Sequence, residues 1–96
     1  MPNANYLKGA GFERDFIALN DREHIGLRTA GSHSCFDVVL IQRGLGNVIF
    51  CQLKRYKKGS PKPKIPKELK KIAEDNDIVV WFVTKEDYKP LEIQIV

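Results

Sequence analysis

The spacing of hydrophobic residues divides the first part of the chain into a helix and a short strand. Residues 7–23 place Phe12, Phe16 and Leu19 at intervals that put them on one side of a helix, with charged residues around them. Residues 25–29, IGLRT, have the composition of a short strand, and the small residues AGSHS that follow are typical of a loop. The chain is therefore predicted to begin helix, strand, loop.

The stretch CFDVVLIQRGLGNVIFCQLK predicts two apolar strands joined by a glycine turn. A turn centred on Gly44-Leu45 makes the numbers of paired residues sum to 89. In this register Asp37 lies opposite Gln52, and Lys54 projects on the same face because side chains alternate along a strand. Three polar groups are thus predicted to converge at one end of an apolar sheet.

The second half of the chain predicts a loop, a helix and two strands. RYKKGSPKPKIPK, from residue 55 on, is rich in proline and cannot continue a central strand, so residues 55–65 are expected to form a flexible basic loop. Pro66 suits the first turn of a helix that ends near Asn76. The segment IVVWFVT, residues 78–84, has the composition of a buried strand. The segment LEIQIV, residues 91–96, predicts a strand in which apolar and polar residues alternate. The order αβββαββ predicts a single α/β domain over residues 1–96, with a central sheet covered by helices.

Basic residues are concentrated in one segment. The net charge of the chain is +4, but residues 54–71 hold nine Lys or Arg and one Glu, which is 9 − 1 = +8, so the rest of the chain is acidic. A local field of this sign is expected where a polyanion such as DNA docks. The alternative is an ordinary solvated charged face.

Composition also restricts the cellular setting. No apolar run approaches the roughly 20 residues that cross a bilayer, and the N-terminal residues lack the apolar region of a signal peptide, so a cytoplasmic protein without membrane contact is expected. Cys35 and Cys51 form no CxxC pair and have no histidine at zinc-ligand spacing. The predicted register places them on opposite faces, and both are expected to stay reduced and pack in the core.

The polar end of the predicted hairpin suits a site for a hard metal ion. Mg²⁺ prefers oxygen ligands, keeps several waters and is often held by one or two carboxylates together with substrate phosphate. Asp37 offers a carboxylate, Gln52 an amide oxygen and Leu53 a backbone carbonyl, while Lys54 could orient an attacking water or stabilise charge in the transition state. The alternative is a purely structural ion pair between Asp37 and Lys54.

The motifs KGAGFERDF, LRTAGS, FDVVLI and FCQLKRY, in this order, resemble the PD-(D/E)xK nuclease superfamily and, more narrowly, the archaeal-type Holliday junction resolvases. The resemblance covers residues 8 to about 56. It implies a restriction-endonuclease-like core, with a central mixed sheet flanked by helices. It also implies a homodimer that uses Mg²⁺, for which Mn²⁺ could substitute, to nick branched DNA.

The resemblance assigns roles to individual residues. Glu13 would complete the metal site with Asp37, Gln52 and the Leu53 carbonyl. Ser32 would lie on a loop near the scissile phosphate. The catalytic set is then Glu13, Ser32, Asp37, Gln52 and Lys54, and the DNA-binding set is Lys8, Arg14, Arg28, Arg55, Lys57, Lys58, Lys62 and Lys64. The structural alternative for Glu13 and Arg14 is an ordinary exposed helix surface.

Two positions depart from the family pattern. Phe36 stands where a proline usually precedes the aspartate, which changes little. Gln52 stands in place of the usual glutamate, which removes one negative charge and should weaken metal binding. The chain of 96 residues is also shorter than the cellular resolvases, which suggests a version encoded by a virus or phage and acting in the host cell.

The sequence thus supports a leading hypothesis and three alternatives. The leading one is a Mg²⁺-dependent endonuclease that resolves four-way junctions by paired nicks. A nuclease of the same chemistry could instead act on flaps, forks or duplex DNA. A non-catalytic DNA-binding module with a decayed site would bind DNA without cutting it, and a structural α/β domain would not bind nucleic acid.

Overall fold

The computed structural model describes residues 4–29 and 35–96, with side chains from residue 11 onward. Two helices and five strands follow one another in the predicted order. They are α1 (Ala4–Asn20), β1 (His24–Arg28), β2 (Val38–Gln42), β3 (Val48–Tyr56), α2 (Lys67–Asn76), β4 (Val79–Glu86) and β5 (Glu92–Ile95). The loop AGSHS, with Ser32, lies outside the described residues.

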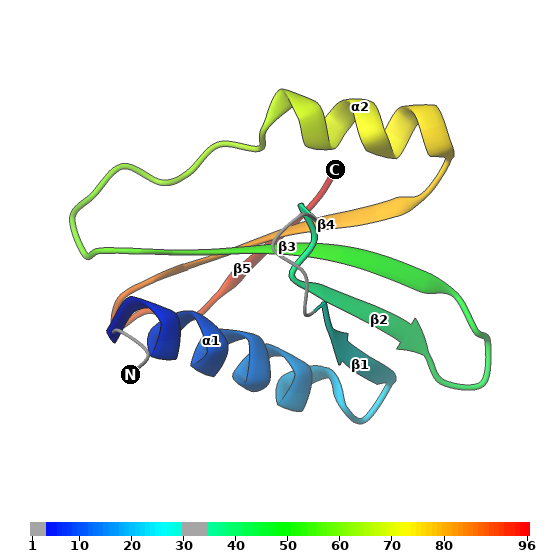
Figure 1. Ribbon diagram of the computed structural model, residues 1–96, viewed down its shortest axis with the longest axis horizontal. Helices are drawn as coiled ribbons and strands as arrows, with labels where there is room; N and C mark the ends of the chain where they lie inside the picture. The colour runs from blue at the N-terminus through cyan, green and yellow to red at the C-terminus, as the bar shows by residue number, and fades with distance from the viewer. Residues whose placement is uncertain (1–3, 30–34) are drawn as a thin grey trace.

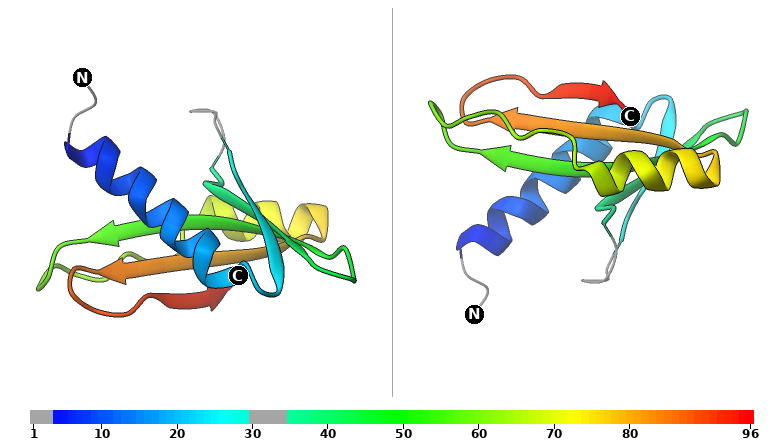
Figure 2. Two further views of the ribbon diagram at one scale, coloured as in Figure 1. Left: turned by 90° about the horizontal axis from the view of Figure 1, so that it is seen from below. Right: turned by 90° about the horizontal axis from the view of Figure 1, so that it is seen from above.

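The strands form one mixed sheet with a helix on each face (Figure 1). The strand order is β1-β2-β3-β4-β5, and all neighbours are antiparallel except β3 and β4, which are parallel. The connection between parallel strands needs a crossover, which α2 supplies. Figure 2 shows α1 and α2 on opposite sides of the sheet. The predicted α/β class and element order are confirmed. Within the described residues, no helix is both long and apolar enough to cross a membrane.

The register of the β2–β3 hairpin is the one predicted from the sequence. Val38 pairs with Cys51, and the ladder continues to Ile41 and Val48, so that paired numbers sum to 89. The turn between the strands places Gly44 and Gly46 at φ of 81° and 72°, in the left-handed region that glycine adopts without a steric penalty. A hairpin with this turn holds the ends of β2 and β3 in a fixed relation.

The core beneath α1 is built around two phenylalanines. Phe16 is fully buried and Phe12 is 5% exposed, and both pack on β2 and β3. The residues of this cluster are Phe12, Phe16, Val38, Leu40, Ile49, Cys51, Leu53 and Val83. The prediction that Leu19 shares this buried face is wrong, since its side chain is 71% exposed. Leu19 lines an open hollow between α1 and the sheet, together with Leu91, Arg55 of β3 and Lys85 of β4.

The opposite face of the sheet is covered by α2, as predicted. Pro66 stands just before the helix with extended backbone, and Leu69 and Ala73 are the buried residues of α2. They pack on Val80 and Phe82 of β4, which are also buried. The basic loop begins later than predicted, because β3 extends through Tyr56.

The last strand is less buried than an alternating pattern suggests. Ile93 and Ile95 of β5 are 42% and 75% exposed. They pair with Val83 and Trp81, so they belong to the face that carries α1. Since β5 is the edge of the sheet and α1 packs on β1, β2 and β3, α1 does not reach these two side chains.

The two cysteines lie on opposite faces of the sheet, as the register predicts. Cys51 is fully buried in the cluster beneath α1, whereas Cys35 packs against the cluster beneath α2. Burial, helped by the negative charge of Asp37, raises the pKa of the Cys51 thiol to about 12. Both thiols are free.

We expect a thiol reagent at pH 8 to modify Cys35 faster than Cys51 in the folded protein, because Cys35 is only partly buried, and to modify both in denaturant. Cys51 is buried and protonated under these conditions, and only the thiolate is nucleophilic. Cys35→Ser is the control, and it should leave no fast-reacting thiol in the folded state. Two fast thiols in the folded protein, or a disulfide within the chain, would contradict this placement.

Candidate functional site

Backbone hydrogen bonds fix Asp37 at the point where β2 begins. Its N–H donates to the Cys51 carbonyl over 2.8 Å, and its own carbonyl accepts from the Thr29 N–H at 3.1 Å. Thr29 also donates through its hydroxyl to the Phe36 carbonyl. The segment that carries Asp37 is therefore held between the end of β1 and the middle of β3. Thr29 lies within the motif LRTAGS, but its residue type and spacing alone predict no such role.

The Asp37 carboxylate is bound to the backbone of β3, which corrects the predicted pairing with Gln52. The ladder ends at Val38 and Cys51, so Asp37 lies outside it. Its Oδ2 accepts the Leu53 N–H at 2.8 Å. That N–H is available because β2 begins only at Val38, opposite Cys51, whereas β3 continues beyond Cys51 and pairs with β4 on its other side. The carboxylate thus turns toward the strand edge and does not stand opposite the Gln52 side chain.

The same edge of β3 offers a second oxygen. The N–H and C=O groups of one strand residue point to the same side of the strand. Since the Leu53 N–H points toward Asp37, the Leu53 carbonyl also points toward the side that β2 leaves unpaired. The Asp37 carboxylate and this carbonyl therefore lie on the same open edge.

The side chain of Gln52 has one satisfied and one unsatisfied polar atom. Its Nε2 donates to the Cys35 carbonyl over 3.0 Å. Its Oε1 is buried and has no hydrogen-bond partner among the residues that the structure describes. Buried polar atoms are rarely left unpaired, because each loses its bonds to water without replacement. An unpaired amide oxygen of this kind is a ligand that a hard cation can use.

The pKa of Asp37 shows which charges surround it. Burial raises this pKa above its usual value, and the Leu53 N–H opposes the shift. The negative charge of Glu13 raises it further, while the positive charge of Lys54 lowers it. The described structure therefore brings Glu13 of α1 and Lys54 of β3 within electrostatic range of Asp37.

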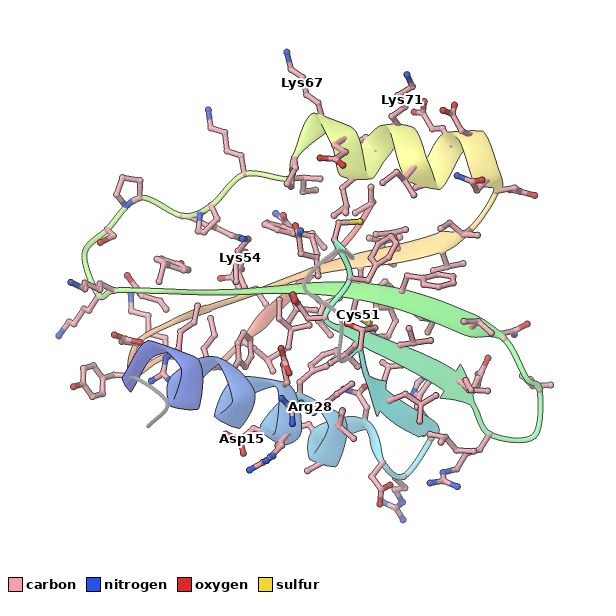
Figure 3. All side chains as sticks on the ribbon, in the orientation of Figure 1. Asp15, Arg28, Cys51, Lys54, Lys67 and Lys71 are labelled. Atoms are coloured by element: carbon pink, nitrogen blue, oxygen red, sulfur yellow. The ribbon has the colours of Figure 1, made fainter. Side chains whose placement is uncertain are left out.

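Lys54 and Asp37 do not form the structural ion pair that was the alternative. Lys54 is exposed, and among the described residues it forms no salt bridge with Asp37. Figure 3 shows its side chain on the same side of β3 as α2. The ammonium group is thus available to a ligand that reaches Asp37.

Glu13 is paired with Arg28, the residue at the end of β1. The Arg28 Nε donates to Glu13 Oε2 at 2.7 Å, and the two side chains are 35% and 21% exposed. Arg28 projects on the α1 face because it pairs with Val38, which is buried beneath α1. The sequence assigned Glu13 to a metal and Arg28 to DNA, but did not foresee that they contact each other.

The predicted DNA-binding residues divide into paired and solvent-facing cations. Arg55 pairs with Asp87 at 2.8 Å, and Lys62 pairs with Glu92. The Gly59 N–H donates to Glu86 at 3.2 Å, so the basic loop is bound to the β4–β5 hairpin at two points. Four of the predicted residues are exposed and form no salt bridge within the described chain: Arg14, Lys57, Lys58 and Lys64. The side chain of Lys8 lies outside the described residues.

The carboxylates alone do not make a metal cluster. In the described part of the chain, no three His, Cys, Asp or Glu side chains lie close enough together to hold an ion. Glu13 and Asp37 are two acids, and the third position is Gln52, an amide. A Mg²⁺ ion that keeps most of its waters needs only one or two carboxylates, so the donor set fits a weakly held hard cation.

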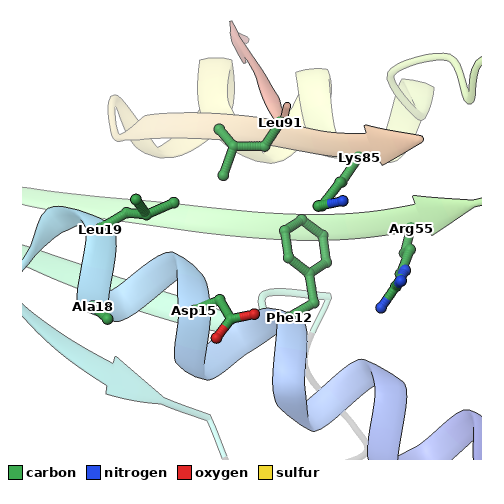
Figure 4. Close-up of a pocket in the computed structure, with 7 residues that line it drawn as sticks. All are labelled: Phe12, Asp15, Ala18, Leu19, Arg55, Lys85 and Leu91. Atoms are coloured by element: carbon green, nitrogen blue, oxygen red, sulfur yellow. The ribbon is translucent and has the colours of Figure 1, made fainter. Parts of the chain in front are cut away.

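A hollow of about 450 Å³ lies away from these residues, between α1 and the β4–β5 region (Figure 4). Phe12, Leu19 and Leu91 line its apolar part, and Arg55 and Lys85 stand at one side. Neither Asp37 nor Lys54 contributes to it. The candidate site is therefore separate from this hollow.

Comparisons with known proteins connect the chain to one kind of fold. No protein-family model matches, and no curated protein sequence matches. The chain is similar to the solved structure of Hjc, a Holliday junction resolvase from the archaeal hyperthermophile Archaeoglobus fulgidus, with a TM-score of 0.69 and 17% identity. The similarity covers 90% of this chain and 75% of that one. The chain therefore has the restriction-endonuclease-like fold of that resolvase.

Proposed function

We propose that the chain is a Mg²⁺-dependent endonuclease that acts as a homodimer on four-way DNA junctions. The observation that carries this proposal is the position of the Asp37 carboxylate, fixed by Leu53 and influenced by both Glu13 and Lys54. The similarity to a Holliday junction resolvase supports the choice of substrate. Two copies would give the two sites that paired nicks require.

The residues of the site have distinct expected roles. Asp37, Gln52 and the Leu53 carbonyl would bind Mg²⁺ together with Glu13. The ion would supply a Lewis acid that polarises the scissile phosphate and activates water. Lys54 would orient the attacking water and stabilise the negative charge that develops on the phosphate. The positive charges on the basic loop would bind the flanking DNA backbone.

The proposal is tested with a labelled four-way junction and a linear duplex of the same sequence, incubated in Mg²⁺ with the wild-type protein and Lys54→Ala. We expect the wild type to cut the junction alone. Lys54→Ala should cut at least about 100-fold more slowly, the scale for loss of a charge-stabilising group. Lys71→Ala, which removes a lysine from α2 on the far side of the helix from the sheet, is the control (Figure 3). Equal rates for wild type and Lys54→Ala would refute the role of Lys54.

Gln52→Glu is expected to bind Mg²⁺ more tightly and to raise the cleavage rate at low Mg²⁺. The change adds a negative charge at the position of an unpaired buried oxygen. The metal concentration that gives half-maximal cleavage should fall, and the metal-free protein should lose stability because the new carboxylate is buried without a cation. An unchanged metal requirement would show that Gln52 Oε1 does not bind the ion.

Removal of the exposed loop lysines is expected to weaken binding to every DNA of similar length. In Lys57→Ala/Lys58→Ala, the slope of log affinity against log salt should fall by about 2, since each phosphate contact contributes about 0.9. Fluorescence anisotropy with a labelled junction measures this slope. Arg22→Ala, in the turn between α1 and β1, is the matched control and should leave the slope unchanged. A full slope in the double variant would exclude the loop from the interface.

A second candidate, a DNA-binding module without nuclease activity, is favoured by the amide at position 52. It predicts junction binding that falls with salt, and no cleavage at any Mg²⁺ or Mn²⁺ concentration. If the wild type binds without cutting and Gln52→Glu cuts, the module is a decayed nuclease. Cleavage by the wild type excludes this candidate.

A further inference from the structure

The ion pair between Arg28 and Glu13 differs in location from the other salt bridges. The other described pairs lie at the hairpin turn, at the basic loop or on the β4–β5 hairpin. The Arg28 pair alone among them uses a carboxylate whose charge reaches Asp37. It therefore connects the candidate metal site to a guanidinium group.

The ion pair between Arg28 and Glu13 reduces the negative charge that a metal ion would meet at the site. Glu13 and Asp37 are the two acids of the site, and in the described structure the charge of Glu13 is balanced by Arg28 over 2.7 Å. A divalent cation at Asp37 would face the like charge of the guanidinium, and Glu13 would have to be shared or released. Because position 52 is an amide, the site has no third carboxylate to replace the negative charge of Glu13 that Arg28 neutralises.

Arg28 also has an alternative partner in the proposed reaction. The guanidinium group binds phosphate as readily as carboxylate, because its N–H groups match the spacing of the oxygens in both. About a third of the Arg28 side chain is exposed, so an anion arriving at the site could contact it without opening the core. Phosphate binding by Arg28 would leave Glu13 free for the cation.

We propose that Arg28 couples metal binding to DNA binding by holding Glu13 until a DNA phosphate takes its place. This inference rests on the proposed nuclease function and names a control built into the same site. Without DNA, Arg28 keeps metal affinity low. With a phosphate bound to Arg28, Glu13 joins Asp37 and metal affinity rises, and by linkage the metal raises DNA affinity by the same factor.

The test measures Mn²⁺ binding to the DNA-free protein by calorimetry. Arg28→Gln should bind Mn²⁺ about 5- to 150-fold more tightly than wild type, the usual range for coupled sites. The gain should disappear in Arg28→Gln/Glu13→Gln. Arg43→Gln is the matched control, because it removes an exposed ion pair, with Asp21, that is remote from Asp37. Thermal unfolding of each variant confirms that it is folded.

A second arm adds a four-way junction with phosphorothioate linkages at the branch, which resist cleavage. The junction should raise the Mn²⁺ affinity of the wild type by a larger factor than that of Arg28→Gln. Equal or weaker Mn²⁺ binding by Arg28→Gln without DNA overturns the proposal, as does equal enhancement of both proteins by the junction. If one of these two results is found while the wild type cleaves the junction normally, the coupling by Arg28 is refuted and the proposed nuclease function stands. Tighter Mn²⁺ binding by Arg28→Gln without cleavage by the wild type overturns the nuclease proposal alone.

Discussion

Asp37→Asn is expected to abolish junction cleavage, with a loss of at least about 100-fold, while DNA binding is retained. The substitution removes a carboxylate from the proposed metal site but keeps an oxygen that can accept the Leu53 N–H. The melting temperature at neutral pH should rise. Burial and the nearby charge of Glu13 disfavour the ionised Asp37 in the folded state, and asparagine has no charge to bury.

The pH dependence of this stability difference gives a separate check. The pKa of Asp37 is raised on folding, so the folded state holds its proton more strongly than the unfolded state. Stability from this group is present below the unfolded pKa and is lost as pH rises through the folded pKa. The stability advantage of Asp37→Asn should therefore grow between acid and neutral pH. A variant that melts lower than wild type at neutral pH would indicate a structural role for the carboxylate. Full cleavage by the variant would refute the site.

Phe16→Ala is expected to lower the free energy of unfolding by about 3–5 kcal/mol, the usual cost of removing a buried phenylalanine. Phe16 is fully buried at the centre of the α1 contact with β2 and β3. Domains of this kind are stable by only about 5–15 kcal/mol, so the variant should be close to unfolding at room temperature. Denaturant unfolding followed by circular dichroism measures the change.

Leu19→Ala is the matched control for Phe16, because it lies on the same helix and is 71% exposed. It should change stability by no more than about 0.5 kcal/mol, as is usual for exposed positions. If Leu19→Ala lowers the free energy of unfolding as much as Phe16→Ala does, the Leu19 side chain must be covered in solution. A small effect of Phe16→Ala would contradict the packing of α1 on the sheet.

The sequence could predict the hairpin because two local signals determine its register. The glycine turn defines the pairing, and the period of two assigns each residue to a face. From these signals Cys35 and Cys51 are correctly placed on opposite faces, whereas the predicted pairing of Asp37 with Gln52 is replaced by the bond from the Leu53 N–H to Asp37. The sequence does not show that β2 begins only at Val38, which leaves the Leu53 N–H free to bind the Asp37 carboxylate. Where a ladder ends depends on the whole sheet.

Contacts between elements that are far apart in the chain also could not be predicted from the sequence. Leu19 has the helical spacing of a buried residue, but it is exposed because an open hollow lies between it and the residues Arg55 and Lys85 of β3 and β4. Glu13 and Arg28 were each identified through the motifs around them, yet their ion pair requires the packing angle between α1 and β1. Periodicity specifies the faces of elements, and packing decides which side chains on those faces meet.

The most direct test of the central claim maps the cuts on a four-way junction labelled in turn on each strand, in Mg²⁺ and in chelator. We expect paired nicks at symmetric positions near the branch, on two strands of like polarity, and none in chelator. Tight, salt-dependent binding of the junction without a cut at any Mg²⁺ or Mn²⁺ concentration would contradict it.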